Sequence, residues 1–424
     1  MVDIRIPDNL KSDHLFLLVG KNPLPNLIAA RLLAKPGATI WLLHSHDPDE
    51  GPRGTKRAGE ELETALLKWN PGLNIQLEGI PSSNNLGIET RIRDILRQNS
   101  LDGTVGLNYT GGTKVMAVHV YRMLEQELAK KQQRPVFSYL DPRRLALRVD
   151  GHRTTPPQII PIIRNPALRQ VVEISLDELA ALHGYERISK TPDWALRENT
   201  PGLLELCAAI AEAHPSPTSF RNWRKWMQIE QFVNLPDLTK YPQLKTICDA
   251  FDTLCGGPGQ ATPDRVAAKL RPNASNPKLT SCDMWFRGVW LEVHGEACIQ
   301  QIAKQKQIKS SDKNLYYRDW REKTDNLELD AAAMYGYQLF AISCEATPKK
   351  RNAKEHLFEV YVRARQLGGD EARAGLVCLM DDPEILEKEL ARAWDTQGQL
   401  KVFGRHDLKD LTGSFKRWFE TANQ

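Results

Sequence analysis

Short apolar runs alternate with amphipathic stretches along the N-terminal third of the chain. The apolar runs have the length of buried strands and lie at residues 14–19, 40–43, 74–79, 103–108 and 136–140. Stretches in which apolar residues recur with helical spacing separate them, at residues 25–33, 58–69, 88–98 and 113–130. Because strands that alternate with helices of this length form βαβ units, the pattern predicts an α/β domain with a parallel, doubly wound sheet over residues 1–160.

The pattern changes after a group of prolines between residues 156 and 166. From there it is mainly helical, with a capping box at Ser175–Glu178, and it predicts a helical linking region over residues 161–280. Strands and helices then alternate again. The helices are expected at 285–305, 354–367 and 383–396, and the strands at 327–334, 338–344, 374–380 and 400–403. We therefore expect a second α/β domain over residues 281–424, interrupted by a charged, mobile stretch at 306–323.

The composition is that of a globular protein. Hydrophobic residues make up 41% of the 424 residues and charged residues 26%, and this length exceeds what one hydrophobic core normally serves. No apolar run approaches the roughly 18 residues of a membrane-spanning helix, and the N-terminal segment lacks the apolar core of a signal peptide. All seven cysteines follow residue 200 without a Cys-x-x-Cys pair. These features predict a cytoplasmic protein with no membrane partner. The formal net charge of +4 names no partner, so any contact with nucleic acid must come from a local patch.

The segment 108–114 reads Asn-Tyr-Thr-Gly-Gly-Thr-Lys and lies between an expected strand and an expected helix. Backbone N–H groups at such a helix start favour an anion, and two glycines allow its close approach. The spacing matches neither a P-loop nor the dinucleotide fingerprint, so ATP hydrolysis is not indicated. A plain turn with a solvated lysine is the alternative. Asn22–Pro23 and Ser45 follow the first two strands and should lie at the same sheet edge, which favours a phosphodiester ligand there.

Two segments together, Gly-Lys-Asn-Pro-Leu-Pro-Asn at 20–26 and the turn at 108–114, resemble the CRISPR-associated Rossmann-fold (CARF) domain of nucleases activated by cyclic oligoadenylate. Residues 174–184 and 367–369 also look like elements of that family. The resemblance implies a Rossmann-like sensor domain joined to a C-terminal restriction-endonuclease-like α/β domain. It also implies a homodimer with cyclic tetra-adenylate, an allosteric activator, bound across its two-fold axis. The implied ligand-binding residues are Asn22, Pro23, Ser45, Asn108, Thr110, Gly111, Gly112, Thr113 and Lys114.

For the C-terminal domain, the resemblance implies a nuclease of the PD-(D/E)xK type. Such enzymes hold Mg²⁺ or Mn²⁺ with carboxylates, while a lysine orients the attacking water. Glu292 looks like the helix carboxylate and Asp330 like the central strand ligand. The next strand departs from the pattern, because Ser343 stands where the family has Glu and Glu345 stands where it has Lys.

Two interpretations of this departure remain open. In the first, Glu345 replaces the missing metal ligand, because positions 343 and 345 share one face of a strand, and Lys349 or Lys350 reaches back. The protein is then a metal-dependent endonuclease acting on DNA, RNA or both in type III CRISPR antiviral defence. Its catalytic residues are Glu292, Asp330, Glu345 and Lys349, of which the three carboxylates bind the metal.

In the second interpretation cleavage is lost, because a serine hydroxyl is a poor ligand for Mg²⁺ and a glutamate cannot act as the cationic partner of an oxyanion. A ligand-controlled sensor or nucleic-acid-binding protein then remains. A further alternative is a ring nuclease that degrades its own cyclic ligand.

One basic aromatic segment permits two readings. Trp223 and Trp226, beside Arg221, Arg224 and Lys225, could stack on and neutralise a nucleic-acid strand. Tryptophans three positions apart on a helix also fit a hydrophobic core, which we favour.

Overall fold

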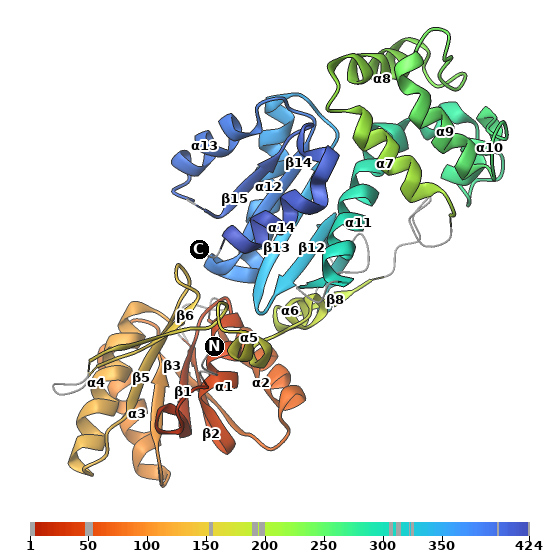
Figure 1. Ribbon diagram of the computed structural model, residues 1–424. Coiled ribbons are helices and arrows are strands. Elements are labelled where there is room, and N and C mark those ends of the chain that lie inside the picture. The colour runs from red at the N-terminus through yellow and green to blue at the C-terminus, as the bar shows by residue number, and fades with distance from the viewer. Residues whose placement is uncertain are drawn as a thin grey trace.

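The computed structural model describes residues 5–46, 54–151, 156–188, 194, 200–304, 308–310, 315–321, 323, 326–396 and 398–422. Figure 1 shows the first α/β domain beside the second, with a helical region on the side of the second domain remote from the first. The domain boundaries near residues 160 and 280 remain predictions. No helix among the described residues is long and apolar enough to cross a membrane.

A seven-stranded sheet in the order β3-β2-β1-β4-β5-β6-β7 forms the first domain. Its strands are β1 (Ser12–Val19), β2 (Ala34–Ser45), β3 (Asn74–Ile80), β4 (Val105–Asn108), β5 (Val136–Asp141), β6 (Ala146–Val149) and β7 (Gln158–Pro161). β1 to β5 are parallel, as predicted, whereas β6 and β7 are antiparallel additions that the apolar pattern did not reveal.

Helices cover both faces of this sheet. They are α1 (Leu24–Leu33), α2 (Lys56–Trp69), α3 (Asn85–Gln98) and α4 (Lys114–Lys130). Leu17 of β1 packs in the core that contains α1 and α2, and its neighbour Leu18 packs in the core that contains α3 and α4. Successive side chains of a strand point to opposite faces, so a strand buried on both sides has the continuous apolar run seen here.

Two short helices and a short strand lead out of the first domain. These are α5 (Pro166–Val171), α6 (Leu176–Leu182) and β8 (Tyr185–Arg187). The predicted capping box starts α6: the Ser175 N–H donates to Glu178 Oε2 at 2.7 Å, and the Glu178 N–H donates to Ser175 Oγ at 3.1 Å. The local signal was therefore sufficient to locate this helix start.

The helical region has an aromatic core. It consists of α7 (Leu203–Ala213), α8 (Pro217–Ile229), α9 (Lys245–Leu254) and α10 (Pro263–Leu270). Trp223 and Trp226 of α8 are fully buried, and the Trp226 ring centroid lies 5.2 Å from that of Phe286. The two tryptophans are thus core residues, as favoured above, and they are not available to stack on nucleic acid.

The second α/β domain contains a five-stranded sheet in the order β15-β14-β13-β12-β9. Its strands are β9 (Lys309–Ser310), β12 (Ala331–Tyr335), β13 (Gln338–Glu345), β14 (Arg373–Cys378) and β15 (Leu400–Phe403). Its helices are α11 (Trp290–Lys304), α12 (Lys350–Gly368), α13 (Pro383–Ala393) and α14 (Leu411–Thr421). Leu339 and Ala341 of β13 share a core with α12, whereas Phe340 and Ile342 share one with α11, so the two helices lie on opposite faces.

The structure corrects one expectation for this domain and adds detail to two others. The stretch 306–323 contains the described strands β9 and β10 (Leu315–Asp319), which the pattern did not predict. The strand expected at 327–334 is broken at Asp330 into β11 (Asn326–Leu329) and β12, which belong to different sheets. The helix expected at 285–305 is present, and its first part is a π-helical turn at Trp285–Val289 that continues into α11. The change of sheet at Asp330 was not predicted, because the run 327–334 is mainly apolar throughout and its pattern does not report which strands it pairs with.

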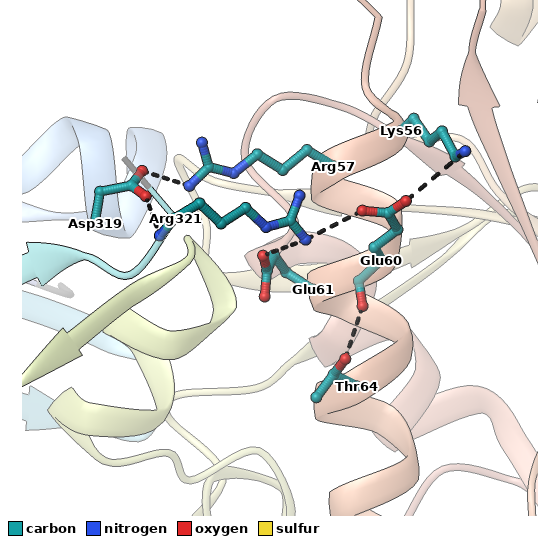
Figure 2. A network of polar contacts seen from close by, with 7 residues as sticks. All are labelled: Lys56, Arg57, Glu60, Glu61, Thr64, Asp319 and Arg321. Carbon is teal, nitrogen blue, oxygen red and sulfur yellow. Dashed lines mark hydrogen bonds and ion pairs between the residues drawn. The ribbon is translucent and has the colours of Figure 1, made fainter. Parts of the chain in front are cut away.

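Charged residues join α2 of the first domain to the end of β10 (Figure 2). Arg57 pairs with Asp319, and Arg321 lies 3.1 Å from both Glu60 and Glu61. Burial raises the pKa of the Glu61 carboxyl, and the guanidinium groups of Arg321 and Arg57 oppose that rise. The first α/β domain is therefore held to the second part of the chain by ion pairs as well as by a shared apolar core.

Candidate functional site

The carboxyl ends of β1, β2 and β4 meet at one edge of the first sheet, as the turn sequences predicted. Gly20 follows β1 and packs against the turn after β4: a Cβ on Gly20 would lie 3.4 Å from the Gly112 nitrogen. A Cβ on Gly111 would overlap the carbonyl oxygen of Leu18. Gly112 has φ +71°, a conformation that favours glycine. Gly111 and Gly112 therefore have a structural role: they allow the two backbone turns to pack closely against each other.

Two clefts lie on either side of the Gly20–Gly112 contact. The smaller, about 330 Å³, is bordered by the start of α2 and contains Lys21, Ser45, Thr55 and Thr113 in its lining; we call it the α2 cleft. The larger, about 580 Å³, we call the interdomain cleft. Its lining combines Gly20, Asn22, Pro25, Tyr109, Thr110, Gly111, Gly112, Tyr139, Leu140 and Pro142 with Arg365, Gly369, Asp370 and Glu371 of the second domain. Both clefts are large enough for parts of a nucleotide ligand.

Positive charge at and beside the α2 cleft comes from side chains and from a helix end. Lys21, exposed on the turn after β1, is part of the lining. Lys114, the exposed first residue of α4, follows Thr113 of the lining but is not itself part of it. Neither lysine forms an ion pair with a residue that the structure describes. Thr113 caps α4 by accepting a hydrogen bond from the Met116 N–H at 3.1 Å. The helix start and the two ammonium groups together favour an anion.

Other predicted ligand residues hold the turns in place. Asn108 is fully buried; its side chain donates to Ser138 Oγ at 3.2 Å and accepts from Thr110 Oγ1 at 2.7 Å. Thr110 Oγ1 also accepts from the Leu140 N–H at 2.7 Å. Asn108 lines neither cleft. Its amide therefore supports the turn from the buried interior.

Asn22, Pro23 and Ser45 shape the other two turns. The Asn22 side chain lines the interdomain cleft and accepts from the Leu24 N–H at 3.0 Å, and Pro23 is buried at the start of α1. Ser45 borders the α2 cleft but is 7% exposed, and it exchanges hydrogen bonds of 2.9 and 3.0 Å with Thr55. Each residue therefore helps to fix the backbone that surrounds a cleft.

Sequence reasoning missed Thr55 and two tyrosines. Thr55 Oγ1 donates to the Val19 carbonyl at 2.8 Å, which ties the start of α2 to the end of β1. Tyr109 and Tyr139 line the interdomain cleft with ring centroids 5.7 Å apart. Burial, followed by the Asp150 carboxylate, raises the pKa of Tyr109, so this phenol stays protonated. Tyr109 belongs to the turn at 108–114. That its ring lines a cleft together with Tyr139 of β5 could not be read from the turn alone.

In the second domain, Asp330 lies where the chain passes from β11 to β12. Its Oδ2 atom accepts hydrogen bonds from Ser343 Oγ at 3.0 Å and from the Cys344 N–H at 2.8 Å. Burial raises the pKa of Asp330, and the two hydrogen bonds partly oppose this rise. The pocket beside it offers about 10 Å³ of accessible space, near the lower limit for one water molecule. Ser343, at the position where the resembled family has glutamate, thus donates to an oxygen of Asp330, the residue predicted to be the central metal ligand.

The other predicted carboxylates approach the same strand from different sides. Glu345 faces α12, where His356 Nε2 lies 3.5 Å from its Oε2. Glu292 is on α11, which packs against the opposite face: a Cβ on Gly295 of that helix would lie 2.9 Å from Cys344 Sγ. Burial, and then the charges of Asp330, Glu292 and Glu345, raise the pKa of the Cys344 thiol. The acidic residues therefore surround Cys344 without converging on one point.

The predicted lysine partners do not line this pocket. Lys349 is exposed before the start of α12 and is absent from the lining around Asp330. Lys350 pairs with Glu389 of α13, so it does not reach back toward Asp330. The cation that does border the pocket is Arg363, which donates to the Glu328 carbonyl at 2.6 Å.

These contacts allow a test of whether a metal ion fits. Among the described residues, no group of three or more His, Cys, Asp or Glu side chains is arranged to hold a metal ion. The pocket is narrow and its central carboxylate already accepts two hydrogen bonds. In this arrangement the residues do not fit Mg²⁺ or Mn²⁺, and the assignment of Glu292, Asp330 and Glu345 as metal ligands remains a prediction from sequence.

Comparison with solved structures shows where this fold occurs. The chain resembles Can2 from Sulfobacillus thermosulfidooxidans, solved in complex with cyclic tetra-adenylate, with a TM-score of 0.65 and 15% identity over 97% of this chain and 98% of that one. It also resembles protein VC1899 from Vibrio cholerae, with a TM-score of 0.65 and 17% identity over 97% and 99% of the two chains. No family model and no curated protein matches the sequence. The likenesses confirm the predicted α/β fold, with a Rossmann-like domain and a second α/β domain in one chain.

Proposed function

We propose that the protein is a sensor of cyclic tetra-adenylate in type III CRISPR antiviral defence, and that the ligand controls a C-terminal domain that acts on nucleic acid. The observation that carries this proposal is the pair of clefts at the Gly20–Gly112 contact, with Lys21 and Lys114 beside a helix start. The shared fold with Can2, which was solved with this ligand, supports the proposal.

The two clefts suit the two chemical parts of such a ligand. Phosphodiester groups carry negative charge, which matches Lys21, Lys114 and the exposed N–H groups at the start of α4. Adenine bases have flat aromatic faces, which match the rings of Tyr109 and Tyr139 in the interdomain cleft.

We further propose that the protein is a homodimer, so that two copies of the sheet edge enclose one ring. Exposed apolar side chains on two adjoining helices support this: Leu86 of α3 is 70% exposed and Val118 of α4 is 58% exposed. Light scattering coupled to size-exclusion chromatography tests it. A monomer at all protein concentrations would contradict this part of the proposal.

Calorimetric titration of the full-length protein with cyclic tetra-adenylate tests ligand binding. A hydrogen bond to a charged group is worth about 1.5–3 kcal/mol, so Lys21→Ala and Lys114→Ala should each weaken binding at least about tenfold. Lys131→Ala is the matched control, because Lys131 is an exposed lysine at the opposite end of α4. Equal affinity in all of these variants would place the phosphates elsewhere, and the amount of intact ligand after incubation would reveal a ring nuclease.

For the C-terminal domain, the contacts of Asp330 favour control of nucleic-acid binding without metal-dependent cleavage. Ser343 donates to the carboxylate that would hold the metal, and Lys350 is held by Glu389. Exposed basic residues supply the charge that binding requires: Lys349 is exposed before the start of α12, and Arg221 and Lys225 are exposed on α8.

Metal-dependent endonuclease activity on DNA or RNA is the second candidate, because the predicted carboxylates still surround Cys344. Gel shift and cleavage assays with single-stranded and supercoiled substrates, Mn²⁺ and cyclic tetra-adenylate distinguish the candidates. Ligand-dependent binding without cleavage is the result we expect. Cleavage that is lost in the Asp330→Ala and Glu345→Ala variants would establish the nuclease instead.

A further inference from the structure

The second domain contributes part of the wall of the interdomain cleft. Its contribution is the end of α12 and the turn that follows, with Arg365, Gly369, Asp370 and Glu371 in the lining. A group bound in this cleft therefore touches both α/β domains. Residues 22 and 369, nearly the whole chain apart, both border the same space.

The contact across the cleft is close. Gly369 has φ +64° and ψ −150°, a conformation that is essentially restricted to glycine. A Cβ at this position would overlap Asn22 Nδ2. A shift of the Asn22 turn toward Gly369 when a ligand enters would therefore require a shift of the turn at Gly369, because the two residues are in contact.

Arg365 is placed to meet an anion there. It pairs with Asp370, and both side chains are about half exposed, at 41% and 55%. An exposed ion pair of this kind contributes at most about 1 kcal/mol, so a phosphodiester group can compete for the guanidinium at low cost. Arginine also presents several N–H donors in a fixed plane, which suits two phosphate oxygens. Glu371 beside it is buried, and burial raises the pKa of its carboxyl to about 7, which reduces repulsion of an anion.

The same helix reaches the pocket of Asp330. α12 has 19 residues, a length of about 28 Å at 1.5 Å per residue. Near its C-terminal end, the carbonyl of Leu367 lies 2.8 Å from His183 Nε2 of the segment after α6. Further toward its start, Arg363 donates to the Glu328 carbonyl, two residues before Asp330, and His356 lies beside Glu345. A packed helix shifts as a unit, so a displacement at Gly369 also moves Arg363 and His356.

We infer that the end of α12 is part of the ligand site, with Arg365 as a phosphate contact, and that α12 passes the occupancy of the interdomain cleft to the pocket of Asp330. This inference rests on the proposed function, because it takes cyclic tetra-adenylate as the occupant of the cleft. The ligand favours one position of α12 over another to the extent that it binds Arg365 better in that position.

Calorimetry and hydrogen exchange on the full-length protein test the two parts. Arg365→Ala should weaken binding of cyclic tetra-adenylate at least tenfold, whereas Arg351→Ala, an exposed arginine at the other end of α12, should leave it unchanged. In the parent protein the ligand should alter exchange of the Cys344 amide, which donates to Asp330. In Arg363→Ala, which is outside the cleft lining, the ligand should still bind but the exchange response at Cys344 should be lost.

The outcomes separate this inference from the proposed function. If the parent protein does not bind cyclic tetra-adenylate, the proposed function fails. If it binds and Arg365→Ala binds equally well, the proposed function stands and the contact to Arg365 is refuted. If the exchange response at Cys344 is absent in the parent protein, or persists in Arg363→Ala, transmission through α12 is refuted. If Arg365→Ala binds more weakly because the cation is missing, Arg365→Lys, which keeps the charge, should bind more tightly than Arg365→Ala.

Discussion

Glu371 should destabilise the folded protein at neutral and alkaline pH. Its side chain is 2% exposed, and burial raises the pKa of its carboxyl from 4.5 to about 7. The neighbouring charges act in both directions: Asp370 raises this pKa further, and Arg373 and Arg365 lower it. Glu371 lines the interdomain cleft, so the effect concerns the turn that we propose as part of the ligand site.

The direction of the effect follows from proton binding by the two states. Below pH 4.5 the carboxyl is protonated in both the folded and the unfolded protein, and it contributes no difference. Between pH 4.5 and about 7 the unfolded state loses its proton first, so stability falls as pH rises. Above pH 7 the full cost is present, about 3 kcal/mol at 1.36 kcal/mol per pH unit.

Glu371→Gln removes the charge and keeps the shape. Compared with the parent protein, this variant should be about 3 kcal/mol more stable at pH 8, and the difference should disappear at pH 4. Urea unfolding followed by tryptophan fluorescence measures both values, because Trp418 packs on Gly375 in the same domain. Glu384→Gln, at an exposed position of α13, is the control and should have no pH-dependent effect. The same stability difference at pH 4 and pH 8 would refute the reasoning.

Three further predictions concern other parts of the molecule. Arg57→Ala and Asp319→Ala should show a coupling energy of about 1 kcal/mol in a double-mutant cycle of unfolding free energies, because the two side chains pair between α2 and β10; additive effects would argue against a stabilising pair. Trp226→Ala should lower the unfolding free energy by about 3–5 kcal/mol, because the ring is fully buried, and a loss below about 1 kcal/mol in urea titrations would show that it is not a core residue. Combining Ser343→Glu with Glu345→Lys should create Mn²⁺ binding measurable by calorimetry that the parent protein lacks; no binding would mean that Ser343 is not what prevents it.

Much of the fold could be predicted because its determinants are local. The run 14–19 is apolar without alternation, and β1 is indeed buried on both faces. The Ser175–Glu178 box starts α6 because both of its hydrogen bonds join residues three positions apart. The break at Asp330 and the strands β6, β7 and β10 could not be predicted in this way, because a strand's length and sheet depend on the partners it pairs with.

For the candidate sites too, local features could be predicted from the sequence and long-range contacts could not. The turn 108–114 was predicted because a strand end, two glycines and a helix start are adjacent in sequence. The roles of its residues were not: Asn108 proved to be a buried support because Ser138 lies 3.2 Å from it on the next strand. Sequence also indicated the departure at Ser343, but not that this hydroxyl would donate to Asp330.

The sequence by itself determined most of the order of helices and strands, the meeting of the turns after β1, β2 and β4 at one sheet edge, and the presence of Ser343 and Glu345 where the family that the chain resembles has other residues. Each of these depends on residue types and on spacings within one element or turn. Only the tertiary structure decided that Gly369 lies against Asn22, that Arg365 lines the same cleft as the turns at Gly20 and Gly112, and that α12 contributes residues both to this cleft and to the pocket of Asp330. The reason is that these contacts depend on strand register and on the packing of two domains, which bring together residues hundreds of positions apart.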